Sequence, residues 1–386
     1  MEKRLKEFKG HKMGELQNFK ELLERATKLY GTKVAFQYKK DIKKEEYTTH
    51  TFQEYKDDVV ALATGLMEKG AKRVAVIGPN RYEWCVAYMG TLVGGMCVVP
   101  LDKLLPDNEI ENLIIRSKAD TVIFDKKYLS AFQKIKEDNK SSLTEYICMD
   151  KVKDFHNYEE LVKQGKQLRN KGDNRYEQTK IDNEKMSIML FTSGTTSASK
   201  AVMLSHKNIC SNINAMPHFV LMYETDVLLS VLPIHHTFEC TITFLYGCLY
   251  CGATIVFCDG LKYISNNLKE YGVTVFVGVP LMLELMYKKI QKGIEKQGKD
   301  KLIKTMTAIT TPLAKMHIDI RKKVYQQILE NLGGKLRLVL YGGAPMEKST
   351  VIGLSAFGID MVQGYGLTET SPVITAETDH FKCPRF

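Results

Sequence analysis

Residues 191–200 read FTSGTTSASK, a stretch that packs one glycine, six hydroxyl side chains and a lysine between two apolar runs. The runs on either side, 188–191 and 201–204, have the length and composition of short buried strands. The stretch therefore predicts a strand-to-strand turn whose backbone N–H groups, hydroxyls and Lys200 could bind phosphate. A plain polar surface hairpin would have a similar composition, so the loop alone leaves that alternative open.

A Walker-type phosphate loop is excluded for this stretch. Such a loop carries a glycine directly before its lysine and continues into a helix. Here Ser199 precedes Lys200, and the residues that follow are strand-like. The phosphate-binding interpretation therefore requires another class of loop.

Outward from this turn, short apolar strands alternate with helical segments. A helix is expected at 51–69, where Gly70 ends it. Strands are expected at 74–77, 98–99, 121–124, 227–232, 254–257, 273–277 and 336–340. This alternation predicts an α/β fold with two βαβ-type sheets flanked by helices. Because 386 residues exceed the usual size of one core, we expect a first α/β subdomain at 1–185, ending in a charged connection, and a second at 186–386.

The composition limits the classes of function. Nine scattered cysteines, with no histidine partner at metal-ligand spacing, argue against a zinc site and a disulfide framework, and they favour a reducing cytoplasm. No apolar run approaches the ~18 residues that span a bilayer. The net charge of +10 indicates an anionic ligand or surface. Nucleic acid is not expected, because acidic residues interleave with the basic ones and no recognition motif accompanies them.

Two further motifs follow the loop in order. Residues 341–346 read YGGAPM and residues 363–370 read QGYGLTET. With 191–200, they resemble the adenine-side, nucleotide–magnesium and phosphate-binding signatures of the adenylate-forming (AMP-binding) superfamily. Residues 232–239, LPIHHTFE, resemble its acyl-CoA synthetase branch. The chain is thus similar to the N-terminal part of bacterial long-chain fatty-acid–CoA ligases.

The resemblance implies which residues bind the nucleotide. Thr192 and Glu369 would be ligands of Mg²⁺, which binds few side chains in addition to substrate phosphates. Tyr365 would stack on adenine. The catalytic candidates are Lys200, His236 and Glu369. The reaction that the resemblance implies joins a carboxylic acid to the α-phosphate of ATP, and it requires stabilisation of the negative charge on the phosphates. The implied nucleotide-binding set is Thr192, Ser193, Gly194, Thr195, Thr196, Lys200, Gly342, Gly343, Ala344, Pro345, Gln363, Gly364, Tyr365, Gly366 and Thr368.

The acid substrate is expected to contact His235 and His236, which follow a strand and a proline. The resemblance favours His236 as the substrate-facing residue. Gly278 could leave room for an acyl chain, and core packing explains the same residue equally well. No carboxylate stands directly beside the histidine pair in the sequence, and a buried ammonium without a counter-charge is costly. An apolar acid is therefore favoured over an amino acid.

The function implied is that of an AMP-forming acid–thiol ligase. With ATP and Mg²⁺ it would convert a long- or medium-chain fatty acid to an acyl-adenylate and pyrophosphate, and then to acyl-CoA and AMP with coenzyme A. Two alternatives stay open. One is adenylation of an amino acid or another acid, and the other is a non-catalytic, truncated form that binds nucleotide or acyl groups.

The chain departs from the family pattern in two respects. Ser197 and Ala201 stand where the family loop carries glycine. The sequence also ends soon after the motif at 363–370, so we expect a truncated β-barrel subdomain and no small C-terminal domain. A chain without that domain, which carries the family's adenylation lysine, is expected to be inactive or only partly active.

The lysine-rich segment 281–304 is predicted to form one amphipathic helix. Leu285, Met286, Ile290 and Ile294 share one side of it, and that side is assigned to the core. The lysines could make a weak peripheral contact with an anionic membrane. A merely solvated helix face is the alternative. The oligomeric state is open, a homodimer included.

Overall fold

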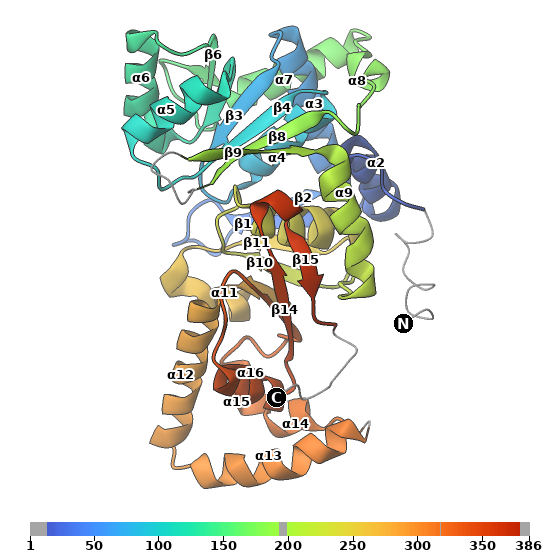
Figure 1. Ribbon diagram of the computed structural model, residues 1–386, viewed down its shortest axis with the longest axis vertical. Helices are drawn as coiled ribbons and strands as arrows, with labels where there is room; N and C mark the ends of the chain where they lie inside the picture. Colours follow the sequence, from blue (N-terminus) through green and yellow to red (C-terminus); the bar gives the residue numbers. More distant parts are fainter. Residues whose placement is uncertain (1–13, 193–198, 317, 379–386) are drawn as a thin grey trace.

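The computed structural model describes residues 14–192, 199–316 and 318–378, and these form two β-sheets with helices between and outside them (Figure 1). The predicted class, two βαβ-type sheets flanked by helices, is confirmed. Parallel strands need long crossover connections, and here helices provide them.

The first sheet has seven strands in the order β7-β6-β5-β3-β4-β8-β9. Its neighbours run parallel except β8 and β9, which form an antiparallel pair. The strands are β3 (Arg73–Ile77), β4 (Cys97–Leu101), β5 (Thr121–Phe124), β6 (Glu145–Cys148), β7 (His156–Asn157), β8 (Met186–Thr192) and β9 (Lys200–Ser205). The inner strands β3 and β4 are buried along nearly their whole length, from Val74 to Ile77 and from Cys97 to Leu101, as expected for parallel strands that are covered on both faces.

The second sheet has eight strands in the order β15-β14-β13-β12-β10-β11-β1-β2. Its six central strands run parallel, and β2 and β15 close the two edges as antiparallel strands. The strands are β1 (Val34–Lys39), β2 (Tyr47–Thr51), β10 (Val227–Ser230), β11 (Thr254–Phe257), β12 (Val275–Gly278), β13 (Leu338–Tyr341), β14 (Asp360–Gly366) and β15 (Val373–Ala376).

The largest core joins the facing sides of the two sheets. Val74 and Val76 of β3 and Val275 of β12 all belong to it, so both sheets pack on the same helices. Contributing helices are α2 (Phe19–Tyr30), α3 (Phe52–Glu68), α4 (Tyr82–Val93), α7 (Tyr158–Asn170), α8 (Arg175–Gln178), α9 (His206–Ala215), the 3₁₀ turn η3 (Met216–His218) and the π-helix η4 (Cys240–Tyr250). The helix expected at 51–69 is α3, which begins at a capping box of Thr51 and Glu54.

Two smaller cores cover the outer faces of the sheets. Ala75 and Ile77 alternate with the inward valines of β3 and pack outward, as the period of a strand requires. The outer helices of the first sheet are α5 (Asp107–Ser117), η2 (Lys126–Tyr128) and α6 (Leu129–Asp138). Phe276 of β12 likewise faces the outer core of the second sheet. The helices on that side are η5 (Leu261–Tyr263), α11 (Ile264–Glu270), α12 (Pro280–Lys296), α13 (Asp300–Lys315), α14 (Arg321–Val324), α15 (Gln326–Glu330) and α16 (Lys348–Ala356).

The prediction of one helix over 281–304 was wrong. The segment forms α12 and the start of α13, which meet at a sharp corner in the lower part of Figure 1. Gly298 adopts φ 63°, a left-handed conformation that ends a helix. The apolar side is also only partly committed to the core, because Ile290 is buried while Leu285 is 60% exposed.

The boundary predicted at 185/186 remains a proposal about subdomains. The sheets themselves draw strands from both sides of it. β8 and β9 follow residue 185 yet belong to the first sheet, and β1 and β2 precede it yet belong to the second. Strand pairing joins segments far apart in sequence, so a linear division of the chain does not follow the sheets.

Within residues 14–192, 199–316 and 318–378, no helix combines the length and the apolar character needed to cross a membrane. The eight cysteines in these ranges are all free thiols.

Candidate active site

A cavity of about 580 Å³ lies where carboxyl ends of strands from both sheets meet. Asp102 after β4 and Thr192 at the end of β8 line it from the first sheet. Segments that follow β10, β12 and β13, and the end of β14, line it from the second sheet. The crevice outside the carboxyl ends of parallel strands is where α/β folds usually bind ligands.

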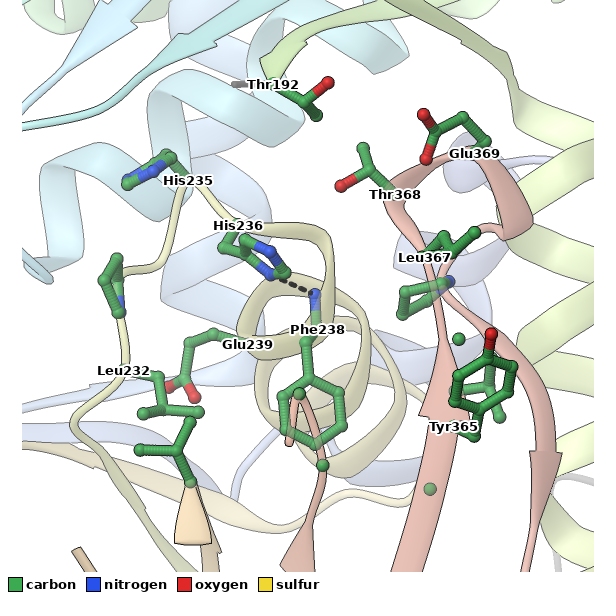
Figure 2. A pocket seen from close by; sticks show the side chains of 18 of the residues that line it. Thr192, Leu232, His235, His236, Phe238, Glu239, Tyr365, Leu367, Thr368 and Glu369 are labelled. Atoms are coloured by element: carbon green, nitrogen blue, oxygen red, sulfur yellow. Dashed lines mark hydrogen bonds between the residues drawn. The ribbon is translucent and has the colours of Figure 1, made fainter. Parts of the chain in front are cut away.

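The cavity brings together most of the predicted site residues, which come from four separate motifs. Those that line it are Thr192, His235, His236, Gly342, Gly343, Gly364, Tyr365, Gly366, Thr368 and Glu369. In Figure 2, Thr192 at the end of β8 lies across from Thr368 and Glu369, which follow β14, and the His236 ring lies below Thr192 in this view.

Five described residues of the predicted set do not line this cavity. Lys200 is exposed, and Ala344 and Pro345 follow the two glycines that line it. The Gln363 side chain accepts a hydrogen bond from the Tyr341 hydroxyl at 3.4 Å. Gly278 is buried beside the Phe276 ring, and the next residue, Val279, supplies the wall. The predicted nucleotide contacts Ser193, Gly194, Thr195 and Thr196 lie outside the described residues.

The predicted strand-to-strand turn has the expected flanks. Thr192 of β8 pairs with Lys200 of β9 in an antiparallel register. On the β9 side, the Arg116 guanidinium of α5 donates to the Ser199 carbonyl at 2.6 Å, and it lies 5.3 Å from the Phe191 ring centre. These contacts anchor both ends of the turn on a helix of the first sheet.

Glycine is required where the backbone is crowded. A Cβ on Gly366 would lie 1.8 Å from the Pro372 carbonyl oxygen, so no larger residue fits at this position. Gly343 adopts φ 84°, which L-residues rarely occupy. The two glycines allow the backbone after β13 and at the end of β14 to lie against the cavity, beside the side chains of Tyr365, Thr368 and Glu369.

His236 is the N-cap residue of α10 (Thr237–Glu239), where its Nδ1 accepts the Phe238 N–H at 3.2 Å. Burial lowers the pKa of His236, so the ring is neutral near pH 7. A neutral ring that accepts at Nδ1 carries its proton on Nε2. The structure therefore presents His236 as a hydrogen-bond donor in the wall of the cavity (Figure 2).

His235 points away from the His236 ring, towards the first sheet (Figure 2). Its Nε2 lies 3.8 Å from Oδ1 of Asp102. Burial nevertheless lowers the pKa of His235 to about 4. The inference that no carboxylate accompanies the pair was therefore wrong. Asp102 comes from the end of β4, and sequence neighbourhood could not show this approach between sheets.

Glu239 is a site residue that the sequence interpretation missed. It lines the cavity and is completely buried, with hydroxyl donors from Ser230 at 2.7 Å and Thr243 at 3.1 Å. Burial raises the pKa of Glu239 to about 8, so the carboxyl is neutral near pH 7. Its place at the end of the motif 232–239 was the available signal. Burial of an acidic residue is not visible in a sequence.

A divalent cation would find few protein ligands in this cavity. Among the described residues, no group of three or more His, Cys, Asp or Glu side chains is placed to hold a metal ion. Glu369 and Thr192 offer one carboxylate and one hydroxyl on opposite walls. This sparse donor set fits Mg²⁺, which commonly binds one or two side chains together with substrate phosphates.

Curated proteins of similar sequence are fatty-acid ligases. The chain is 28% identical to fatty acyl-CoA synthetase B of Dictyostelium discoideum, over 90% of this chain and 55% of that protein. It is 28% identical to long-chain-fatty-acid–CoA ligase 5 of Rattus norvegicus, over 84% of this chain and 51% of that protein. A chloroplastic long-chain-fatty-acid–[acyl-carrier-protein] ligase of Arabidopsis thaliana is 25% identical, over 85% and 52%. The chain thus spans about half the length of these relatives.

Solved structures share the fold. The N-terminal domain of FACL13 from Mycobacterium tuberculosis superimposes with a TM-score of 0.67 at 18% identity, covering 94% of this chain and 79% of that one. The anthranilate CoA ligase AuaEII, solved with anthranoyl-AMP, superimposes with a TM-score of 0.73 at 16% identity, and the match covers 98% of this chain and 65% of that one. A sequence model of the AMP-binding enzyme family matches residues 23–385. With its motifs gathered at one cavity, the chain belongs to the AMP-binding enzyme family.

Proposed function

We propose that this chain binds ATP and a fatty acid and forms the acyl-adenylate in an acid–thiol ligase reaction. A carboxylate oxygen of the acid attacks the α-phosphorus of ATP, and the bond to pyrophosphate breaks. The thiol of coenzyme A then attacks the acyl carbon, and AMP leaves. The related ligases named above, for CoA and for acyl-carrier protein, support a thiol acceptor.

The observation that carries this proposal is the convergence of three distant motifs on one cavity. Thr192, the turn at Gly342 and Gly343, and the segment 364–369 come from three different strands and two sheets. A nucleotide that contacts all three would lie across the gap between the sheets. The cavity of about 580 Å³ has the size of a small-molecule site.

The proposed nucleotide contacts divide between the two sheets. Thr192 and Lys200 would bind the outer phosphates from the first sheet, together with the turn that joins them. Tyr365, which is 61% exposed, is free to stack on adenine from β14. Glu369 and Thr192 would hold Mg²⁺, and the bound cation would neutralise charge on the phosphates.

The proposed contact to the acid is the Nε2–H of His236. A neutral donor suits a carboxylate that must remain nucleophilic, because a full positive charge would hold the oxygen more tightly. As the acid oxygen bonds to phosphorus, the same N–H can donate to the adjoining acyl or phosphate oxygen. Gly278 would leave room for the acyl chain next to Val279, which lines the cavity.

We infer a fatty acid because the cavity wall near His236 is largely apolar. Leu232, Phe238, Val279 and Val373 line it, and they offer no partner for a second polar group on the substrate. Amino-acid adenylation is the second candidate, favoured by one observation. Asp102 also lines the cavity and could pair with an α-ammonium group.

Acid-dependent ATP–pyrophosphate exchange tests the function and separates the two acids. With palmitate, decanoate, benzoate and a mixture of the twenty amino acids as alternatives, we expect exchange with a fatty acid only. Asp102→Asn is the matched variant, since it removes the charge and keeps the shape. Exchange that needs an amino acid and falls at least tenfold in Asp102→Asn would favour the second candidate.

A reducing cytoplasmic location is part of the proposal, supported by the eight free cysteines of the described residues. The proposed partners are small molecules, a carboxylic acid and coenzyme A, with no role for nucleic acid.

A further inference from the structure

The loop that carries the two histidines is held from both sheets by one hydrogen-bonded chain. Residues 231–236 connect β10 to α10. Asn80, in the connection from β3 to α4 of the first sheet, donates from Nδ2 to the Leu232 carbonyl at 2.6 Å. Its Oδ1 accepts the Ile234 N–H at 3.2 Å. A single amide side chain thus fixes the loop on both sides of Pro233.

The series of hydrogen bonds continues from the Asn80 amide to Glu239. Asn80 Nδ2 also donates to the Ser230 hydroxyl at 2.9 Å, and Ser230 in turn donates to Oε1 of Glu239 at 2.7 Å. Thr243, in the first turn of the π-helix η4, donates to the other Glu239 oxygen at 3.1 Å. Ser230 ends β10 and Glu239 ends α10, so their contact joins the two elements that flank the histidine loop.

We propose, building on the proposed function, that Asn80 and Glu239 are positioning residues that hold His236 against the acid, and that Glu239 does so as a neutral carboxyl. Neither side chain needs to touch the substrate for this role. A loop displaced by about 1 Å can lower an enzymatic rate about 100-fold, because the reacting groups lose their alignment.

Complete burial favours the neutral form of Glu239, and in the described part of the chain no cation forms an ion pair with it. The two hydroxyl donors and the nearby Lys103 favour the charged form, but they only partly offset the effect of burial on the pKa. Burial raises its pKa to about 8. Ionisation would leave a buried charge without a cationic partner, which is strongly unfavourable. We therefore expect the loop to lose its closed form as the pH rises above 8.

Several other titratable groups face Glu239, and they must be separated from it. Cys240 adjoins it in the chain and Cys85 faces it from α4, but burial raises the pKa of both thiols well beyond this range. Lys103, which follows β4, is the nearby cation, and burial lowers its pKa. His235 and His236 in the same cavity are already neutral near pH 7. Lys103 is thus the other group that could titrate in the alkaline range.

The first experiment is a pH profile of kcat/KM for the acid in the exchange assay, from pH 6.5 to 9.5. If only the neutral carboxyl is active, the wild type should lose about tenfold per pH unit above pH 8. Glu239→Gln keeps the shape without a titrating proton, so its profile should stay flat there. Lys103→Met is the control, and its kcat/KM should fall above pH 8 as steeply as that of the wild type. A Glu239→Gln profile that falls like the wild type would overturn the proposal.

Two further variants test positioning rather than charge. Asn80→Ala and Ser230→Ala break the chain of hydrogen bonds without touching the proposed nucleotide contacts. Each should lower kcat/KM for the acid at least tenfold and leave the Kd for ATP·Mg²⁺, measured by calorimetry, within twofold. Wild-type kcat/KM in both variants would contradict the positioning role, as would an equal loss of ATP affinity.

A readout without catalysis distinguishes failure of this inference from failure of the proposed function. A carboxyl kept neutral in the folded state makes the free energy of unfolding fall as pH rises from about 5 to 8, because the unfolded chain ionises first. Urea unfolding should show this slope in the wild type and a smaller one in Glu239→Gln. Equal slopes would overturn the neutral carboxyl even if no acid supports exchange.

Discussion

The two sheets use the same architecture but treat their carboxyl edges differently. At the first sheet, Arg81 pairs with Asp125 at 2.7 Å and Asp150 at 2.9 Å, beyond the ends of β5 and β6. At the second sheet, glycine turns and the histidine loop leave the edge open as a cavity. Ligands usually bind at the carboxyl edge of a parallel sheet. An edge whose polar groups are already paired with one another has none left to bind a ligand.

Local residue chemistry explains this difference. Beyond β5 and β6 of the first sheet, the Arg81 side chain is paired with Asp125 and Asp150, and it also pairs with Glu83. The corresponding segments of the second sheet contain Gly342, Gly343, Gly364 and Gly366, which bring backbone to the cavity between lining side chains such as Tyr365 and Glu369. The first edge therefore serves as scaffold, and of the residues that the structure describes in that sheet and its loops, Asp102 and Thr192 line the cavity.

The largest effect should come from removing the two charges proposed to act on the nucleotide, Glu369 beside the open edge and Lys200 at the start of β9. In a Glu369→Ala plus Lys200→Ala variant, we expect the affinity for ATP·Mg²⁺ to fall about 100-fold or more. Charge-assisted contacts are worth about 1.5 to 3 kcal/mol each, and the two act on the same phosphates. Calorimetric titration measures the change directly.

The matched control removes a glutamate and a lysine that pair on the surface. Glu184 and Lys207 are 71% and 64% exposed, so Glu184→Ala plus Lys207→Ala should bind ATP like the wild type. If the two double variants lose the same affinity, the contrast between the edges has no functional meaning.

The second effect concerns the closed edge and is one of stability. Arg81→Ala should lower the free energy of unfolding by about 3 kcal/mol, since it leaves Asp125 and Asp150 without their cation. The estimate is at the lower end for buried ion pairs because the Arg81 side chain is 22% exposed. Urea unfolding gives the value, and ATP affinity should change less than threefold.

Arg169→Ala is the control for that measurement. Its pair with Glu177 is more exposed, at 30% and 51%, and should contribute no more than about 1 kcal/mol. A loss of ATP affinity in Arg81→Ala as large as in the double variant of Glu369 and Lys200 would show that both edges take part in binding.

The smallest effect concerns the helices outside the second sheet. Exposed lysines of α12 could attract the protein to an anionic membrane, with at most about 1 kcal/mol for each lysine at the surface and less in salt. Co-sedimentation with phosphatidylserine vesicles at low salt should fall a few-fold when Lys288, Lys289, Lys292 and Lys296 become glutamine.

The control variant places the same charge change on the half that holds the first sheet. Lys118, Lys151, Lys153 and Lys163 are exposed there, and their replacement by glutamine should not alter sedimentation. Absence of vesicle binding by the wild type at low salt, or equal losses in both variants, would leave α12 as a solvated element of the fold.

Much of the fold could be predicted from local sequence alone. The alternation of apolar strands and helices, the helix capped by Thr51, and the two strands that end at Thr192 and begin at Lys200 all follow from periodicity and capping over a few residues. The family resemblance rested on motifs of the same kind, which are contiguous and spaced along the chain. Gly298 was also a visible stop signal, although it was not used to divide the helix expected at 281–304.

Only the tertiary structure decided which residues share the cavity wall. Asp102 approaches His235 from another sheet, and the Asn80 side chain reaches across 150 residues of sequence to Ser230. Such contacts leave no periodic trace, because they depend on how two sheets pack over one layer of helices. Glu239 shows the same limit, since its neutral state depends on burial by residues far along the chain. The sequence determined the elements and the chemical groups, and packing between sheets determined which of those groups meet.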